Sequence, residues 1–175
     1  MDDAKNGQQI IGRHKIVPVI ALETADQAKP LAEALIAGGL PIAEVTFRTE
    51  AAEASIRAMA QFDQLLVGAG TVLTVEQVDR AADAGARFAV SPGFNSNVVR
   101  RCQAINLPIF PGVSNPTDIE MALDHELQTV KFFPAEAFGG LPTLKAIAAP
   151  YRMMQFIPTG GINANNLADY LAFTP

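Results

Sequence analysis

The sequence of 175 residues is poor in the features that mark secreted and membrane proteins. Its single cysteine, Cys102, cannot form an internal disulfide or make a metal site by itself. Its longest apolar stretches, such as residues 16–22, fall far short of the ~20 residues that cross a bilayer. That stretch contains Pro18, follows an acidic N-terminus and offers no small-x-small cleavage site, so we do not interpret it as a signal peptide. We therefore expect a cytoplasmic protein without a membrane segment.

Positive charge is also scarce. The chain has 13 basic and 18 acidic residues, which gives a net charge of -5 and a pI near 5.0. Such a chain repels polyanions, so we expect no nucleic-acid partner, and any phosphate must be bound by a local pocket. A hydrophobic content of 49% and a mean hydropathy of +0.19 exclude the disordered class. The length favours one domain, residues 1–175, over two.

Short apolar runs rich in Val, Ile and Phe recur at intervals of roughly 21 to 26 residues. The seven runs begin near Lys15, Pro41, Leu65, Arg87, Pro108, Thr129 and Met154. Between them lie segments with helical spacing, which we expect at residues 25–37, 75–84 and 164–171 among others. Thr24, Thr74 and Asn163 are the expected N-terminal caps of these three helices, and Gly38, Gly39 and Gly85 end the first two.

Alternating strands and helices without hairpins predict parallel strands joined by right-handed crossovers. An open doubly wound sheet and a closed barrel both fit this order. The open sheet usually carries G-x-G-x-x-G after its first strand, and that motif is absent at this position. Instead, charged and hydroxyl residues lie in or at the ends of several strands, namely Glu44, Thr46, Arg48, Thr71, Lys131 and Thr159. The pattern favours an α/β fold of the TIM (β/α)8-barrel type, with its chemistry at the C-terminal rim.

Only seven of the eight βα units are evident, and the C-terminal one is missing. Three explanations stay open: the sequence is part of a longer chain, a rearrangement or a partner chain supplies the last unit, or the sheet is open. An incomplete barrel would leave two strand edges unpaired. Measuring the mass of the expressed protein separates the first explanation from the others.

The two-residue period of a strand decides which side chains share a face. In residues 42–48 the polar Glu44, Thr46 and Arg48 share one face, which we expect to point into the barrel. In residues 129–135 the same parity puts Lys131, Phe133 and Ala135 on one side. An inward Lys131 would have its pKa lowered by burial and by a nearby Arg48, so that its neutral amine could attack a ketone and form a Schiff base. Glu44 could then transfer the protons; the alternative is a buried ion pair of Lys131 and Glu44.

Other polar positions suit an anionic substrate. Arg48 can bind a small carboxylate beside Thr71, which follows an expected turn at residues 68–70, although an arginine at a strand end is also typical of a solvated rim. Gly160 and Gly161 adjoin the expected helix at 164–171, where free backbone amides can bind a phosphate; the alternative is an ordinary turn. Residues 91–93 and 111–114 are expected rim turns that line the pocket.

The histidines and the cysteine suggest no chemistry. His14 and His125 have no carboxylate or second histidine at ligand spacing, so we expect no metal and no cofactor. Cys102 lies in a helical stretch and is expected to be a small core residue.

Five ordered segments carry a resemblance to a known family: residues 44–50 (EVTFRTE), 67–72 (VGAGTV), 91–93 (SPG), 131–136 (KFFPAE) and 158–162 (PTGGI). In order and spacing they resemble the 2-keto-3-deoxy-6-phosphogluconate and 4-hydroxy-2-oxoglutarate aldolases. The resemblance implies a class I, metal-free aldolase on a (β/α)8 barrel, a homotrimer that produces pyruvate and an aldehyde from a keto acid. It implies Lys131 as the Schiff-base lysine, Glu44 as the general acid and base, Arg48 and Thr71 as the carboxylate site, Pro92 and Phe133 as pocket walls, and Thr159, Gly160 and Gly161 as the phosphate site.

The sequence departs from this family at its end, because members continue into an eighth strand whose Gly-Ser segment completes the phosphate site. Two rival functions stay open: a sugar-phosphate lyase or isomerase that forms no imine, and a non-catalytic scaffold. The preferred keto acid and the stereochemistry also stay open.

Overall fold

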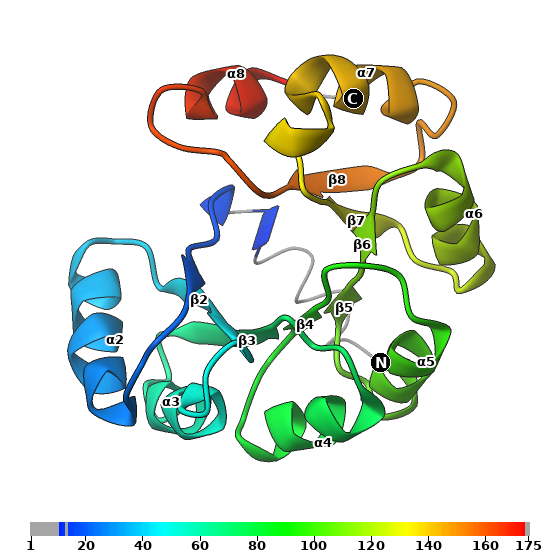
Figure 1. The fold of residues 1–175 in the computed structure, drawn as a ribbon. Coiled ribbons are helices and arrows are strands. Elements are labelled where there is room, and N and C mark those ends of the chain that lie inside the picture. The colour runs from blue at the N-terminus through cyan, green and yellow to red at the C-terminus, as the bar shows by residue number, and fades with distance from the viewer. Residues whose placement is uncertain (1–10, 13, 174–175) are drawn as a thin grey trace. The chain divides into compact units, whose positions relative to one another are not determined.

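A computed structural model describes residues 11–12 and 14–173, in which short strands alternate with helices (Figure 1). These residues form two compact units. The first unit extends to Ser91 and also includes Ser96–Ile109. The second unit comprises Pro92–Asn95 and the chain from Phe110 onward. The expectation of one domain over residues 1–175 stays a prediction.

The sheet of the first unit has the strand order β1-β2-β3-β4-β5. Its strands are β1 (Val19–Ile20), β2 (Ile42–Thr46), β3 (Leu66–Gly70), β4 (Ala89–Val90) and β5 (Ile109–Phe110), whose last residue already belongs to the second unit. The β1–β2, β2–β3 and β3–β4 pairs are parallel. The helices are η1 (Ala25–Gln27), α2 (Ala28–Ala37), α3 (Ala52–Met59), α4 (Val75–Asp83) and α5 (Ser96–Ala104).

Helix α3 shows how the first unit buries its outer apolar side chains. It packs against β2 and β3, and its Ile56 and Met59 are fully buried. On β2, Ala43 and Val45 are fully buried as well. Each large apolar side chain buried in this way contributes about 1.5–3 kcal/mol to the folding free energy. This packing holds in place the strands that carry the polar residues.

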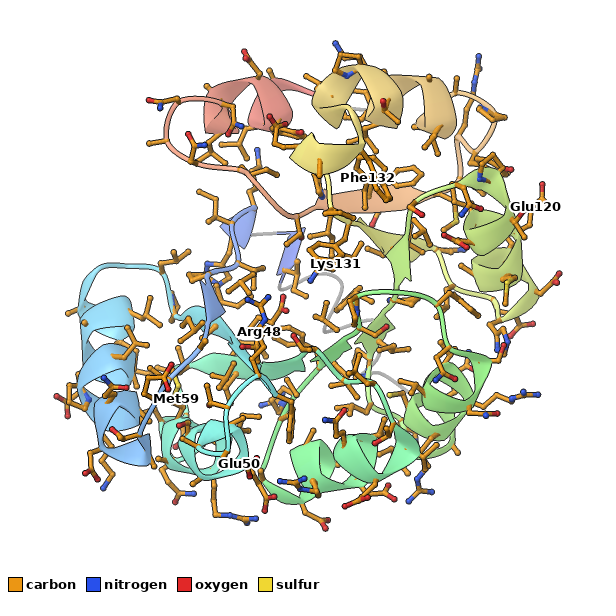
Figure 2. The ribbon with its side chains drawn as sticks, viewed as in Figure 1. Arg48, Glu50, Met59, Glu120, Lys131 and Phe132 are labelled. Atoms are coloured by element: carbon orange, nitrogen blue, oxygen red, sulfur yellow. The ribbon has the colours of Figure 1, made fainter. Side chains whose placement is uncertain are left out.

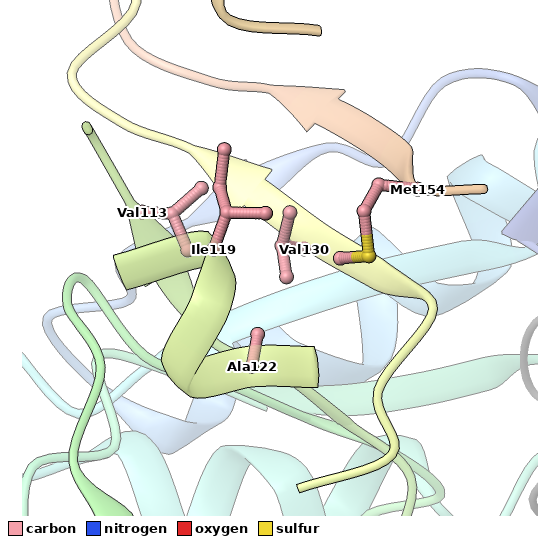
Figure 3. Close-up of a cluster of buried hydrophobic side chains, with 5 residues drawn as sticks. All are labelled: Val113, Ile119, Ala122, Val130 and Met154. Atoms are coloured by element: carbon pink, nitrogen blue, oxygen red, sulfur yellow. The ribbon is translucent and has the colours of Figure 1, made fainter. Parts of the chain in front are cut away.

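The second unit has the strand order β6-β7-β8, and both pairs are parallel. Its strands are β6 (Gly112–Val113), β7 (Thr129–Phe132) and β8 (Gln155–Pro158), and its helices are α6 (Pro116–Asp124), η2 (Glu136–Phe138), α7 (Gly140–Ala148) and α8 (Leu167–Ala172). On β7, Phe132 points toward α7 and Lys131 points away from it (Figure 2). Below α7, Phe132 belongs to a buried cluster with Ala135, Leu144 and Tyr170. A second cluster joins α6 to the strands (Figure 3) through Val113, Ile119, Ala122, Val130 and Met154.

Each of the seven apolar runs contains a strand, but the fifth run contains two. Pro111 separates β5 from β6, and proline cannot donate a ladder hydrogen bond. The helix caps are confirmed at Thr74, whose side chain accepts a hydrogen bond from the Gln77 amide, and at Gly85, whose φ is +94°. None of the helices between residues 14 and 173 is long and apolar enough to cross a membrane.

The expected start of the last helix was wrong. It begins at Leu167 rather than near Ala164, and Asn163 does not cap it. Asn163 accepts a hydrogen bond from the Asn165 amide, and its own amide donates to Asn166 Oδ1. Asparagine side chains compete with helical hydrogen bonds in this way, so the segment closes a turn before the helix starts.

Candidate active site

Glu44 lies on β2 with its side chain close to the neighbouring strand β3. The residue is only 4% exposed. Glu44 pairs with Gly68 in the parallel register, and Gly70 lies two residues further along the same face of β3. A methyl group at Gly70 would lie 2.2 Å from Glu44 Oε1, so only glycine leaves room for this carboxyl group. Glu44 and Thr46 both lie in β2 two residues apart, so strand alternation places them on the same face, as the sequence predicts.

The expectation of a turn at residues 68–70 was wrong, because these residues form the second half of β3. Their small side chains make room for neighbours. A methyl group at Gly68 would lie 2.3 Å from the buried Phe88 ring. Glycine in a strand interior often marks such close approaches, and here the ring and the Glu44 carboxyl group occupy the space.

Arg48 and Thr71 are brought together by two chain segments that follow neighbouring strands. Arg48 lies in the turn after β2, beyond the residues to which strand parity applies, and it is exposed. Its Nε donates a hydrogen bond to Thr71 Oγ1 at 3.4 Å. Thr71 has a φ of +57° directly after β3. A guanidinium group beside a hydroxyl group is a suitable site for a small carboxylate.

Thr46, the other polar residue of β2, makes a backbone contact instead. Its hydroxyl donates to the Ile20 carbonyl at 2.9 Å, and that of Thr49 donates to the Leu22 carbonyl at 2.6 Å. The two hydroxyls fasten the end of β2 to the chain around β1. Thr46 therefore supports the strand that carries Glu44.

Lys131 lies on β7, the central strand of the second unit, and is 4% exposed. Its Nζ lies 5.0 Å from the centroid of the Phe133 ring. Burial keeps the amine from bulk water, while the face of an aromatic ring attracts a cation. The placement of Ala135 on the same face as Lys131 was wrong. The strand ends at Phe132, and Ala135 is buried with Phe132, Leu144 and Tyr170 instead.

Pro92 lies beside the strand that neighbours Lys131. A methyl group at Gly112 would lie 2.0 Å from the Pro92 carbonyl oxygen, so the backbone at Pro92 passes directly over β6. Gly112 pairs with Lys131 in the parallel register. Pro92 therefore lies against the strand that pairs with β7, and its role as a pocket wall stays a prediction. Gly112 and Val113 form a strand, however, and not the rim turn expected at 111–114.

Thr159, Gly160 and Gly161 follow β8 in a turn held against the chain that follows Lys131. The Ala135 amide donates to the Thr159 carbonyl at 2.8 Å, and the Glu136 amide donates to the Gly160 carbonyl at 3.0 Å. Gly160 and Gly161 have φ angles of +101° and +80°, a conformation that side chains disfavour. The expected helix N-terminus next to this turn was wrong, because α8 begins only at Leu167. Any phosphate site here depends on the amides and the hydroxyl of the turn.

Sequence reasoning missed the contact of Tyr170 with Glu136. The Tyr170 hydroxyl donates a hydrogen bond to Glu136 Oε1 across 34 residues of chain. Burial and the neighbouring carboxylate raise the pKa of Tyr170 to about 12, so the phenol is a proton donor at neutral pH. Glu136 ends the segment of residues 131–136, one of the five that resemble the family, but no periodicity in the sequence pairs it with Tyr170.

Cys102 is a core residue, and the described residues contain no cluster of metal ligands. Cys102 is fully buried in α5, and burial raises the pKa of its thiol to about 12, which confirms it as a small core residue. Within the described part of the chain, no group of three His, Cys, Asp or Glu side chains could hold a metal ion.

The nine candidate residues divide between the two units. Glu44, Arg48 and Thr71 belong to the first; Lys131, Phe133, Pro92, Thr159, Gly160 and Gly161 belong to the second. The first group offers a buried carboxyl group and a guanidinium group that donates a hydrogen bond to a hydroxyl group. The second offers a buried amine beside an aromatic ring, and a turn rich in backbone amides. The pairing of Lys131 with Glu44 stays a prediction.

The chain matches the protein-family model "Aldolase: KDPG and KHG aldolase" over residues 8–175. KDPG and KHG abbreviate 2-keto-3-deoxy-6-phosphogluconate and 4-hydroxy-2-oxoglutarate. Among curated proteins, the 2-dehydro-3-deoxy-phosphogluconate aldolase of Haemophilus influenzae is 53% identical over 169 residues, which are 94% of this chain and 80% of that protein. The KHG/KDPG aldolase of Escherichia coli is 42% identical over 168 residues, 95% of this chain and 79% of that protein.

Among solved structures, the KDPG aldolase of Legionella pneumophila, with pyruvate captured as a covalent carbinolamine intermediate, superposes with a TM-score of 0.87. It is 42% identical, and the match covers 90% of this chain and 77% of that one. This similarity confirms the predicted fold class, an α/β fold of the TIM-barrel type.

Proposed function

Because the chain belongs to the KDPG and KHG aldolase family, we propose that it reversibly cleaves 2-keto-3-deoxy-6-phosphogluconate to pyruvate and glyceraldehyde 3-phosphate. The chain is an aldolase, a carbon–carbon lyase that acts on a small keto acid. The shorter 4-hydroxy-2-oxoglutarate is a second substrate of the same class, as the name of the Escherichia coli relative suggests. The observation that carries the proposal is the burial of Lys131 on β7 beside Phe133.

Lys131 is the proposed nucleophile. Its neutral amine attacks the ketone carbon of the substrate and gives a carbinolamine, which loses water to form an imine. The protonated imine then accepts the electron pair of the carbon–carbon bond that breaks, and the aldehyde leaves. Reprotonation of the resulting enamine and hydrolysis release pyruvate and restore the amine. The covalent carbinolamine of the Legionella pneumophila relative supports this chemistry.

Glu44 is the proposed acid and base, because carbinolamine formation, dehydration and cleavage each move a proton. Arg48 and Thr71 are the proposed carboxylate site, and their hydrogen bond at 3.4 Å supports a common role. Pro92 and Phe133 are the proposed pocket walls near the amine. Thr159, Gly160 and Gly161 are the proposed phosphate site.

Reductive trapping tests the imine. Borohydride added with pyruvate should attach a stable three-carbon adduct to the peptide that contains Lys131, as read by mass spectrometry. Lys131→Arg keeps a long nitrogen-bearing side chain at this position but removes the nucleophilic amine, so it should give no adduct. An adduct on another residue, or no adduct at all in the unsubstituted protein, would contradict imine formation at Lys131. Cleavage that survives Lys131→Arg would favour a lyase or isomerase that needs no imine.

Three broader expectations belong to the same proposal: a homotrimer, a cytoplasmic location and a single barrel domain. They follow from the family resemblance and from the sequence composition. Light scattering of the purified protein should give three times the mass of the chain, and a monomer would contradict the trimer. Cell fractionation checks the location.

A further inference from the structure

The contact between Tyr170 and Glu136 joins a buried residue to an exposed one. Tyr170, on α8, is 8% exposed and belongs to the buried cluster with Phe132, Ala135 and Leu144. Its ring is therefore held by packing. Glu136 begins η2 and is exposed. The phenol is thus a fixed donor that determines where the carboxylate of Glu136 lies.

Two glycines surround the Glu136 side chain. A methyl group at Gly161 would lie 2.6 Å from Glu136 Cβ, and one at Gly140 would lie 2.7 Å from Oε1. Both glycines have positive φ angles, +80° and +61°. The side chain of Glu136 therefore passes between the start of α7 and the turn of residues 159–161.

The backbone strengthens this connection. The Glu136 amide donates to the Gly160 carbonyl at 3.0 Å, and the preceding amide donates to Thr159. Residue 136 thus holds the turn by its amide and is itself held by Tyr170 through its carboxylate. If the phenol hydrogen bond is lost, the carboxylate is free to move beside the turn, where its charge would repel a bound phosphate.

We propose that Tyr170 and Glu136 are a positioning pair that fixes the turn of residues 159–161 and so determines affinity for phosphorylated substrates. This inference rests on the proposed function, in which that turn binds the phosphate. Neither residue touches the reacting carbon in this role. The pair should therefore affect KM for a phosphorylated keto acid and leave the chemical step alone.

The test compares two substrates in steady-state kinetics. Tyr170→Phe should raise KM for 2-keto-3-deoxy-6-phosphogluconate about ten-fold, the effect of one lost hydrogen bond to a charged group. Its kcat should stay within about two-fold, and KM for unphosphorylated 4-hydroxy-2-oxoglutarate should not change. Glu136→Gln keeps an acceptor oxygen for the phenol and removes the charge, so it should retain the affinity for the phosphorylated substrate.

A matched control exists in the same unit. The Tyr151 hydroxyl donates to Glu120 Oε1 at 3.0 Å, so Tyr151→Phe removes a similar hydrogen bond from a different place. It should leave both KM values unchanged. Equal changes for the two substrates in Tyr170→Phe, or a change confined to kcat, would assign the pair a purely structural role and overturn the proposal.

A second variant keeps the test decisive if Tyr170→Phe does not fold. Glu136→Asp keeps the negative charge at this exposed position but shortens the side chain, so that its carboxylate no longer reaches the phenol, and it should raise the same KM. Unchanged kinetics in Glu136→Asp would overturn the pair. Borohydride trapping in the unsubstituted protein distinguishes failure of the proposed function from failure of the positioning pair. If Lys131 forms no adduct, the proposed function is wrong. If Lys131 forms the adduct but the variants keep their KM values, only the proposal about Tyr170 and Glu136 is wrong.

Discussion

The two groups of candidate residues are built on different kinds of backbone. Glu44 lies on β2, whose five residues are all buried and pair along their whole length with β3. The turn of residues 159–161 lies beyond β8, a strand that is only partly buried. It is held by the amides of residues 135 and 136, and Glu136 in turn accepts a hydrogen bond from a tyrosine 34 residues away. A strand position follows from local alternation, whereas a turn position depends on contacts between distant residues.

Lys131 combines both kinds of support, and its removal should have the largest effect. The residue lies on a regular strand, and the segment that follows it holds the turn. Lys131→Met keeps the length and volume of the side chain without the amine, so the fold should persist. We expect kcat/KM to fall by at least about 1,000-fold in a coupled pyruvate assay, since no other group replaces the nucleophile. Retained activity in a correctly folded variant would contradict the assignment.

Core substitutions test whether the two units unfold together. Ile56 in α3 and Ile119 in α6 are both fully buried, one in each unit. Replacing either by alanine should cost about 2–5 kcal/mol of unfolding free energy, as lost burial and a residual cavity require. Calorimetry should show one transition that both variants lower, as the prediction of a single domain demands. Two transitions, each shifted by one variant only, would separate the units.

Glu44→Gln tests the candidate residue that lies on a strand of the first unit. The amide fills the same volume but cannot accept and return a proton, so kcat should fall about 100-fold or more. Gly70→Ala should approach the same loss, because its methyl group would occupy the position of Glu44 Oε1. Gly12→Ala is the matched control, since nothing lies within 4 Å of the added methyl group. If Gly70→Ala keeps full activity, the location of Glu44 does not depend on that glycine.

Arg48→Lys should have the smallest of these effects. Lysine keeps the charge but loses the planar fork that binds a carboxylate through two hydrogen bonds. We expect an increase of about ten-fold in KM for pyruvate in the synthetic direction, with kcat little changed. Thr71→Val should act in the same direction, because it removes the hydroxyl that accepts from Arg48 Nε. An unaffected KM in both variants would place the carboxylate elsewhere.

Sequence patterns predicted correctly which side chains share a face wherever a regular strand continued. The alternation in β2 and β7 placed Glu44 and Thr46 together and Lys131 opposite Phe132, because successive side chains of a strand must face opposite sides. The same rule failed at Ala135, where the strand had already ended. It also failed at residues 68–70, because glycines in a sequence do not show whether they form a turn or leave space for a neighbouring side chain.

The sequence by itself therefore determined the order of strands and helices, the family, and which residue types could do chemistry. Those properties depend on short-range periodicity and on local motifs. Only the tertiary structure decided where β7 ends, why Gly70 must be glycine and which residue holds Glu136. Each of these depends on which side chains meet across tens of residues, and packing between elements selects those encounters.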